Sequence, residues 1–139
     1  MEEVKKIKNN GEIVYAVGRR KEALARVRLS KGNGQIMVNG KPIGEYFSSF
    51  ISQKIYSKPL EITKTLNKYH ISIKVEGGGR NAQLEAVVHG ISRALSKTDG
   101  SLRPILKKEK FLTRDARVKE RRKYGNAGKA RAKKQSPKR

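Results

Sequence analysis

The chain is 139 residues long and carries 34 Lys and Arg against 12 Asp and Glu, a formal net charge of +22. This length fits one folded unit, and a hydrophobic content of 35% allows only a modest core. The sequence has no apolar run long enough for a membrane span and none of signal-peptide length at its start. Cys is absent, which excludes disulfides, thiolate zinc sites and a cysteine nucleophile. We therefore expect a soluble, cytoplasmic protein whose partner is a polyanion.

The positive charge is concentrated near the C-terminus. Residues 1–102 hold 18 basic and 9 acidic side chains, whereas residues 103–139 hold 16 basic and only 3 acidic ones. Residues 116–139 contain too few apolar side chains to offset the conformational entropy that the segment would lose on ordering. We expect a basic extension that becomes ordered on its partner. The alternative is a solvated tail that only aids solubility.

The first half of the chain predicts strands. A short apolar strand over residues 13–17 ends at Gly18, and Arg19, Arg20 and Lys21 follow at a strand end or turn. Residues 23–30 alternate with period two, which puts Arg26 and Arg28 on the face opposite the apolar residues. A turn at residues 31–34 and a strand at 35–38 predict a hairpin with the preceding strand.

Helices are expected in the second half. Residues 43–58 suit one or two short helices that Pro59 ends, with Ile43, Phe47, Phe50, Ile51 and Ile55 forming a buried stripe. A helical connector over residues 60–66, a strand over 69–75, a long helix from about Asn81 to Lys97 and a short helix over 101–108 follow. We expect a two-layer α/β or α+β domain over residues 12–110, between an N-terminal extension (1–11) and a basic tail (111–139).

The glycine loop Gly77-Gly78-Gly79 fits the pattern G-x-G-x-x-A, and Asp99 lies at a spacing typical of dinucleotide binding. We reject that interpretation because Asp99 lies in a helix-ending turn and most of the sheet precedes the loop. Two interpretations are left. Backbone N–H groups of Gly78 and Gly79 approach an RNA phosphate at the helix N-terminus, or the loop is only a flexible turn.

The sequence lacks the residue patterns that are typical of enzyme active sites. His70 and His89 have no partners at metal-ligand spacing, and no hydrolase motif is present. We expect no metal, no cofactor and no enzymatic activity. Two alternatives stay open: a nucleotide-binding enzyme built on the glycine loop, and a generic nucleoid or RNA chaperone protein.

Abundant Lys and Arg with occasional aromatic residues favour RNA as the polyanion. Arg binds phosphate bidentately and stacks on exposed bases, while Lys supplies a point charge. Arg26, Arg28, the turn at 18–21 and the tail are expected to form one basic surface. The alternative is that Arg26 and Arg28 are only the solvated side of a sheet. The 24 residues from 116 onward, fully extended, would span about 80 Å.

Eight short motifs occur in order along the chain: Gly18-Arg-Arg-Lys21, Asn33-Gly34 with Val38-Asn-Gly40, Glu45-Tyr-Phe47, Gly77-Gly-Gly79, His89-Gly-Ile91 with Arg93-Ala-Leu95, Leu102-Arg-Pro104, Phe111-Leu-Thr-Arg-Asp-Ala-Arg117 and Glu120-Arg-Arg-Lys-Tyr-Gly125. Together they resemble the small ribosomal subunit protein nine family, bacterial type, over roughly residues 12–139. Each motif alone is weak, but their order is specific.

The resemblance implies an α+β fold: a β-α-β domain with a four-stranded sheet and two helices on one face, like the second domain of ribosomal protein five. It implies 16S rRNA in the head of the small subunit as the main partner, neighbouring head proteins, no membrane and no homo-oligomer. It also implies that the tail reaches the tRNA in the P site, although Pro137 departs from the family's usual ending.

The residues expected to bind rRNA are those of the basic turn, the sheet face, the glycine loop and the tail. They are Arg19, Arg20, Lys21, Arg26, Arg28, Gly78, Gly79, Arg114, Arg117, Arg121, Arg122, Lys123, Tyr124, Lys129, Arg131, Lys133 and Lys134. Lys138 and Arg139 are expected to contact the anticodon stem-loop of the tRNA.

Overall fold

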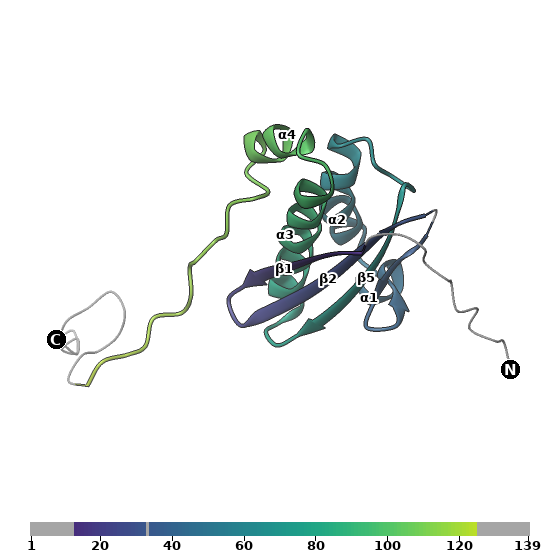
Figure 1. Ribbon diagram of the computed structural model, residues 1–139. Coiled ribbons are helices and arrows are strands. Elements are labelled where there is room, and N and C mark those ends of the chain that lie inside the picture. The colour runs from purple at the N-terminus through teal and green to yellow at the C-terminus, as the bar shows by residue number, and fades with distance from the viewer. Residues whose placement is uncertain (1–12, 33, 125–139) are drawn as a thin grey trace, which may run out of the picture.

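The computed structural model describes residues 13–32 and 34–124. One mixed sheet carries the domain, with the long helix α3 lying across one of its faces (Figure 1). The elements in chain order are β1 (Val14–Arg20), β2 (Ala23–Lys31), β3 (Ile36–Val38), β4 (Lys41–Pro42), α1 (Ile43–Tyr46), α2 (Phe50–Ile62), β5 (Tyr69–Glu76), α3 (Arg80–Thr98) and α4 (Leu102–Lys108). None of these helices is long and apolar enough to cross a membrane.

The sheet confirms the α+β class but differs from the prediction in strand number and order. It has five strands in the order β1-β2-β5-β3-β4, where four were expected. The predicted β2–β3 hairpin is wrong, because β2 pairs with every residue of β5 instead. β3 pairs in parallel with the other side of β5. The reason is length: β5 offers β2 eight paired residues, whereas β3 has only three. The first strand also runs to Arg20, beyond its expected end at Gly18.

The core lies between the sheet and α3. The alternation predicted for β2 is confirmed, since Ala25, Val27 and Leu29 are at most 1% exposed while Arg26 and Arg28 are exposed. From α3, Val87, Ile91 and Leu95 are fully buried against it. The predicted helices near residues 81–97 and 101–108 are both present as α3 and α4.

Helix α2 is longer than predicted and turns a different face to the core. Pro59 lies inside the helix, which continues to Ile62. Pro59 and Leu60 are buried, whereas Phe50 and Ile51, expected in the buried stripe, are 68% and 70% exposed. Only the α1 side of that stripe, Ile43 and Phe47, is buried as expected. The sequence thus offers two apolar stripes, and the one nearer the C-terminal end of α2 faces the core.

Side chains of α3 reach over the free edge of β1. His89 Nδ1 accepts a hydrogen bond from the Arg19 N–H at 3.3 Å, Arg93 donates to the Val17 carbonyl at 2.5 Å, and Lys97 donates to the Tyr15 carbonyl at 2.9 Å. The spacings match, because four helical residues rise about 6 Å and two strand residues about 6.7 Å. Three of the outward backbone groups of β1 are therefore satisfied by one row of helix side chains.

Candidate nucleic-acid interface

The basic turn and the glycine loop lie side by side at one end of the domain. Lys21 is at the tip of the β1–β2 turn with a φ of 50°, and its side chain is exposed. Gly77 and Gly78 have φ values of 73° and 65°, and both pack against this turn: a Cβ on Gly77 would lie 2.5 Å from the Glu22 carbonyl oxygen. A side chain there would be strained by both conformation and space. The glycines are therefore needed to place the turn next to the start of α3.

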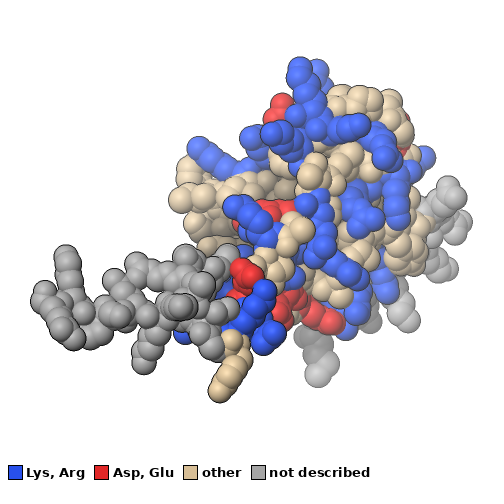
Figure 2. Space-filling view, turned by 90° about the vertical axis from the view of Figure 1, so that its left-hand side faces the viewer, with Lys and Arg blue, Asp and Glu red and all other residues tan. Residues whose placement is uncertain are grey.

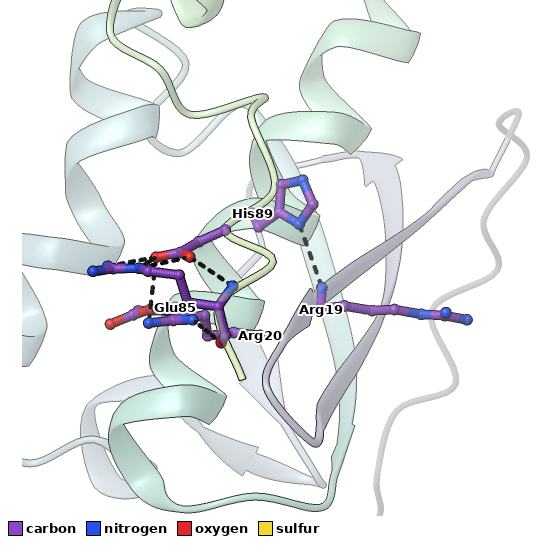
Figure 3. Close-up of polar contacts among 6 residues, drawn as sticks. Arg19, Arg20, Glu85 and His89 are labelled. Atoms are coloured by element: carbon purple, nitrogen blue, oxygen red, sulfur yellow. Dashed lines mark hydrogen bonds and ion pairs between the residues drawn. The ribbon is translucent and has the colours of Figure 1, made fainter. Parts of the chain in front are cut away.

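Arg19 and Arg20 are neighbours in sequence but differ in surroundings. The Arg19 side chain points away from the domain and is exposed, as Figure 3 shows. Arg20 is only 8% exposed. Its Nε pairs with the Glu85 carboxylate, its Nη1 donates to the Arg117 carbonyl at 2.8 Å, and its Nη2 lies 3.3 Å from Asp115 Oδ2. All three guanidinium nitrogens of Arg20 are thus occupied by protein oxygens.

Asp115 and Arg117 form a closed unit at the start of the extension. The Arg117 guanidinium binds both carboxylate oxygens, with Nη2 to Oδ2 at 2.8 Å and Nε to Oδ1 at 3.0 Å, and its backbone N–H donates to Oδ1 at 3.1 Å. These hydrogen bonds, with the nearby charge of Arg20, hold the pKa of Asp115 far below its ordinary range. Asp115 is therefore a carboxylate at any ordinary pH, and it joins Arg20 to Arg117.

Residues 111–112 attach the same segment to the domain through apolar contacts. Phe111 and Leu112 are half-buried and pack against the core, and the backbone of Leu112 forms a hydrogen bond with His89. A small hollow of about 160 Å³ between β1, α3 and this segment is lined by Arg20, Glu85, His89 and Phe111 among others. Residues 111–117 thus contact the domain, and the end of the described extension runs outward from it (Figure 1).

His89 is neutral in this arrangement. Burial lowers its pKa, and the charges of Arg93 and Arg114 lower it further, while the hydrogen bond with Leu112 opposes the shift. Because Nδ1 accepts from Arg19, the neutral ring carries its proton on Nε2. His89 thus serves as a contact between β1 and residues 111–112.

Arg26 and Arg28 lie apart from this end, on the sheet face opposite α3. Both are exposed, and Lys74 of β5 stands beside Arg26 in the register. Glu76 pairs with Lys74 at 3.3 Å and with Arg26 at 3.8 Å. The structure therefore divides the predicted surface into the turn region and the open sheet face.

The remaining predicted residues are on the extension. Arg114, Arg117, Arg121, Arg122, Lys123 and Tyr124 are all exposed. Lys129, Arg131, Lys133, Lys134, Lys138 and Arg139 lie outside the described residues. Figure 2 shows Lys and Arg spread over much of the face that it presents, with Asp and Glu in a few small groups.

Sequence reasoning missed Glu85 and Asp115, which hold the extension through Arg20. It also missed the row His89, Arg93 and Lys97, which bonds to the backbone of β1. The i, i+4, i+8 spacing of the row was visible, but nothing in the sequence shows which strand it meets. Asp115 stands out as an acid between Arg114 and Arg117. Over residues 13–32 and 34–124, no group of three His, Asp or Glu residues is arranged to hold a metal ion.

Comparison with known proteins identifies the family. Residues 18–139 match the family model described as ribosomal protein S9/S16. The small ribosomal subunit protein uS9 of Maridesulfovibrio salexigens is 56% identical over 125 residues, covering 90% of this chain and 95% of that protein. The protein of the same name from Lawsonia intracellularis is 56% identical over 128 residues, covering 92% and 98%.

These relatives are ribosomal proteins and not enzymes. The prediction that the chain is no enzyme is thereby confirmed, and the alternative of a nucleotide-binding enzyme is wrong. The resemblance read from the eight ordered motifs is also confirmed. The chain belongs to the ribosomal protein S9/S16 family.

Proposed function

We propose that the chain is a structural constituent of the small ribosomal subunit that binds 16S rRNA in the head and extends its tail to the P site. The observation that carries the proposal is the 56% identity to small-subunit proteins over 90% of the chain. Its location would be the ribosome, beside other proteins of the head. We also propose that its fold is that of the second domain of ribosomal protein five.

The turn region supplies one set of rRNA contacts. Arg19 and Lys21 are exposed cations of the turn beside the glycine loop, and Gly79 directly precedes α3. Arg114 is an exposed cation of the extension near His89. Their charges favour phosphate groups, which dominate the affinity of proteins for nucleic acids. Arg20 differs from its neighbours, because its guanidinium is engaged by Glu85, Asp115 and Arg117. We assign Arg20 to positioning the extension.

The extension supplies the second set of rRNA contacts. Arg121, Arg122 and Lys123 are exposed where the described chain points away from the domain, and Tyr124 beside them is free to stack on an exposed base. Lys129, Arg131, Lys133 and Lys134 continue the series of cations. Lys138 and Arg139 would then lie against the anticodon stem-loop of the P-site tRNA.

Reconstitution of small subunits tests both parts of the proposal. Subunits are assembled with the full chain or with a chain lacking residues 135–139, washed in high salt and assayed for the protein and for P-site tRNA retention. We expect stoichiometric recovery of both chains and weaker tRNA retention for the shortened one. Equal tRNA retention would contradict the contact by the tail tip.

The same wash separates this proposal from a generic nucleoid or RNA chaperone protein. Non-specific binding is almost entirely electrostatic, so its affinity falls by orders of magnitude with added salt. A protein held in a defined place within the particle stays bound. Loss of the full chain in the wash would therefore exclude the structural role and favour the generic binder.

A further inference from the structure

The sheet face opposite α3 carries a hollow of about 640 Å³. Its floor is formed by β2 and β5, which contribute Arg26, Arg28, Ser72 and Lys74, and its side by the turn Asn39–Gly40 after β3. No helix of the described residues covers it, since α3 lies on the other face. We call this hollow the sheet trough.

The side of the trough is fixed in place. Asn39, with a φ of 49°, accepts a hydrogen bond from the Val75 N–H at 2.9 Å and donates one to the Val75 carbonyl at 3.1 Å. Its side-chain amide thereby continues the pairing of β3 with β5 beyond the end of the strand. A hollow whose side is held in this way needs little reorganisation to receive a ligand.

The charge in the trough selects an anion. Arg26, Arg28 and Lys74 project from neighbouring strands, and Glu76 is the one carboxylate that pairs with them among the described residues. The Arg26 and Lys74 side chains are 56% and 69% exposed. Both can therefore turn toward a phosphate without leaving a buried charge unpaired.

An aromatic ring stands beside the trough in line with Arg28. Tyr15 is the cross-strand partner of Arg28 and Ser72 follows on β5, so the three form one row across the sheet. Tyr15 is 57% exposed, and the Arg28 guanidinium lies over its ring at 5.7 Å from the centroid. Tyrosine rings and arginine planes are the surfaces on which proteins stack unpaired RNA bases.

We propose that the sheet trough binds an unpaired nucleotide of RNA. The base stacks on the Tyr15 ring or the Arg28 plane, the phosphate lies between Arg26 and Lys74, and the Ser72 hydroxyl is within the same row to bond the base or ribose. A duplex would not use Tyr15, because its bases are already stacked on one another. The inference rests on the proposed rRNA binding and specifies the class of RNA structure that this face selects.

Binding of the full-length protein to a transcript of the head region of 16S rRNA tests the proposal, with affinity measured over a range of salt. Tyr15→Leu removes the stacking ring and should weaken binding about tenfold, without changing the salt dependence. Tyr15→Phe keeps the ring and should bind like the wild type. Arg28→Lys keeps the charge but loses the plane, and should also weaken binding at an unchanged salt slope.

The charged residues should behave in the opposite way. Arg26→Gln and Lys74→Gln should each reduce the slope of log K against log salt by about 0.7, the value for one phosphate contact on a single strand. Since these side chains are exposed, thermal unfolding of each variant should match the wild type.

Ultraviolet cross-linking in assembled subunits provides the second readout. We expect the peptide that contains Tyr15 to carry a nucleotide, and the cross-link to disappear in Tyr15→Leu. The inference is overturned if the wild type binds the transcript while Tyr15→Leu and Arg28→Lys bind equally well, or if Tyr15 cross-links to a protein. Failure of the wild type to bind the transcript would instead refute the proposed function.

Discussion

Arg20 holds the first residues of the extension on the domain, because its three guanidinium nitrogens each reach a different residue. Glu85 belongs to α3, while Asp115 and Arg117 belong to the segment that leaves the domain. Arg suits this position because its planar fork donates in several directions at once, which the single ammonium of Lys cannot do. The direction in which the extension departs is therefore set by a buried arginine.

Replacing Arg20 should loosen residues 113–117. Arg20→Gln leaves Asp115 with only Arg117 and removes a buried, charge-assisted network, at a cost of about 2 kcal/mol. We expect trypsin to cleave after Arg114 and Arg117 on the order of tenfold faster, since cleavage follows local opening. Mass spectrometry of the early fragments measures this rate.

Arg19→Gln is the matched control for that experiment. It removes the same charge one residue away, from a side chain that points away from the cluster. It should leave both cleavage rates unchanged. Equal acceleration by the two variants would mean that net charge, and not the Arg20 contacts, holds the segment.

His89 makes the stability of the domain depend on pH. Its folded pKa lies below the ordinary value of 6.5, so the unfolded chain takes up the proton more readily. The stabilisation is complete above pH 6.5 and is lost as the pH falls below that value toward the folded pKa. Protonation also removes the acceptor that Nδ1 offers to the Arg19 N–H.

Urea unfolding at pH 7.5 and pH 5.5 checks this prediction. The wild type should lose more free energy of unfolding between the two values than His89→Gln, which has no proton to gain at this position. His70 is present in both chains, so its contribution cancels. An identical loss in the two chains would show that His89 is not the responsible group.

At the scale of elements, α3 lies unusually close to β1 because glycines face each other at the crossing. A Cβ on Gly18 would collide with the Ala86 carbonyl oxygen and lie 2.8 Å from the Gly90 Cα. A Cβ on Gly90 would lie 2.6 Å from Val27 Cγ2. This approach brings His89 and Arg93 within reach of the β1 backbone.

Gly18→Ala should therefore destabilise the domain by about 3 kcal/mol, because both colliding groups are backbone and have nowhere to move. Gly44→Ala is the control: nothing lies within 4 Å of its Cβ, and it occupies the short helix α1. It should be neutral or slightly stabilising. Chemical denaturation compares the two, and a Gly18→Ala variant as stable as the wild type would contradict the close packing.

The elements that the sequence predicted well are those whose pattern repeats several times. β2, β5 and α3 each carry their apolar period over eight or more residues, and only one face of each could be buried. Helix α2 could not be oriented in this way, because it has apolar residues on two faces. The position of β3 in the sheet was predicted wrongly, because strand order depends on which of the long strands pair with each other. The local sequence pattern of a strand does not indicate its pairing partner.

At the scale of the whole molecule, the net charge of +22 is distributed over the turn region, the open sheet face and the extension. Most of the predicted site residues among those described are exposed, as charge and alternation indicated. Arg20 is the exception. It shares the inward face of β1 with Ala16 and Gly18, but the strand was expected to end at Gly18, so the alternation was not extended to it. Its surroundings arise from Glu85 and Asp115, which lie 65 and 95 positions away in the chain.

The row of α3 side chains along β1 also affects how copies of this protein meet one another. His89, Arg93 and Lys97 occupy three of the backbone groups to which an added strand would bind. At the opposite edge, β4 has two residues and one of them is Pro42, which has no N–H to donate. Among the described residues, each edge of the sheet therefore offers an added strand few free backbone groups, and like charge keeps copies apart. A newly made molecule is thus protected from self-aggregation during the interval before it encounters its RNA.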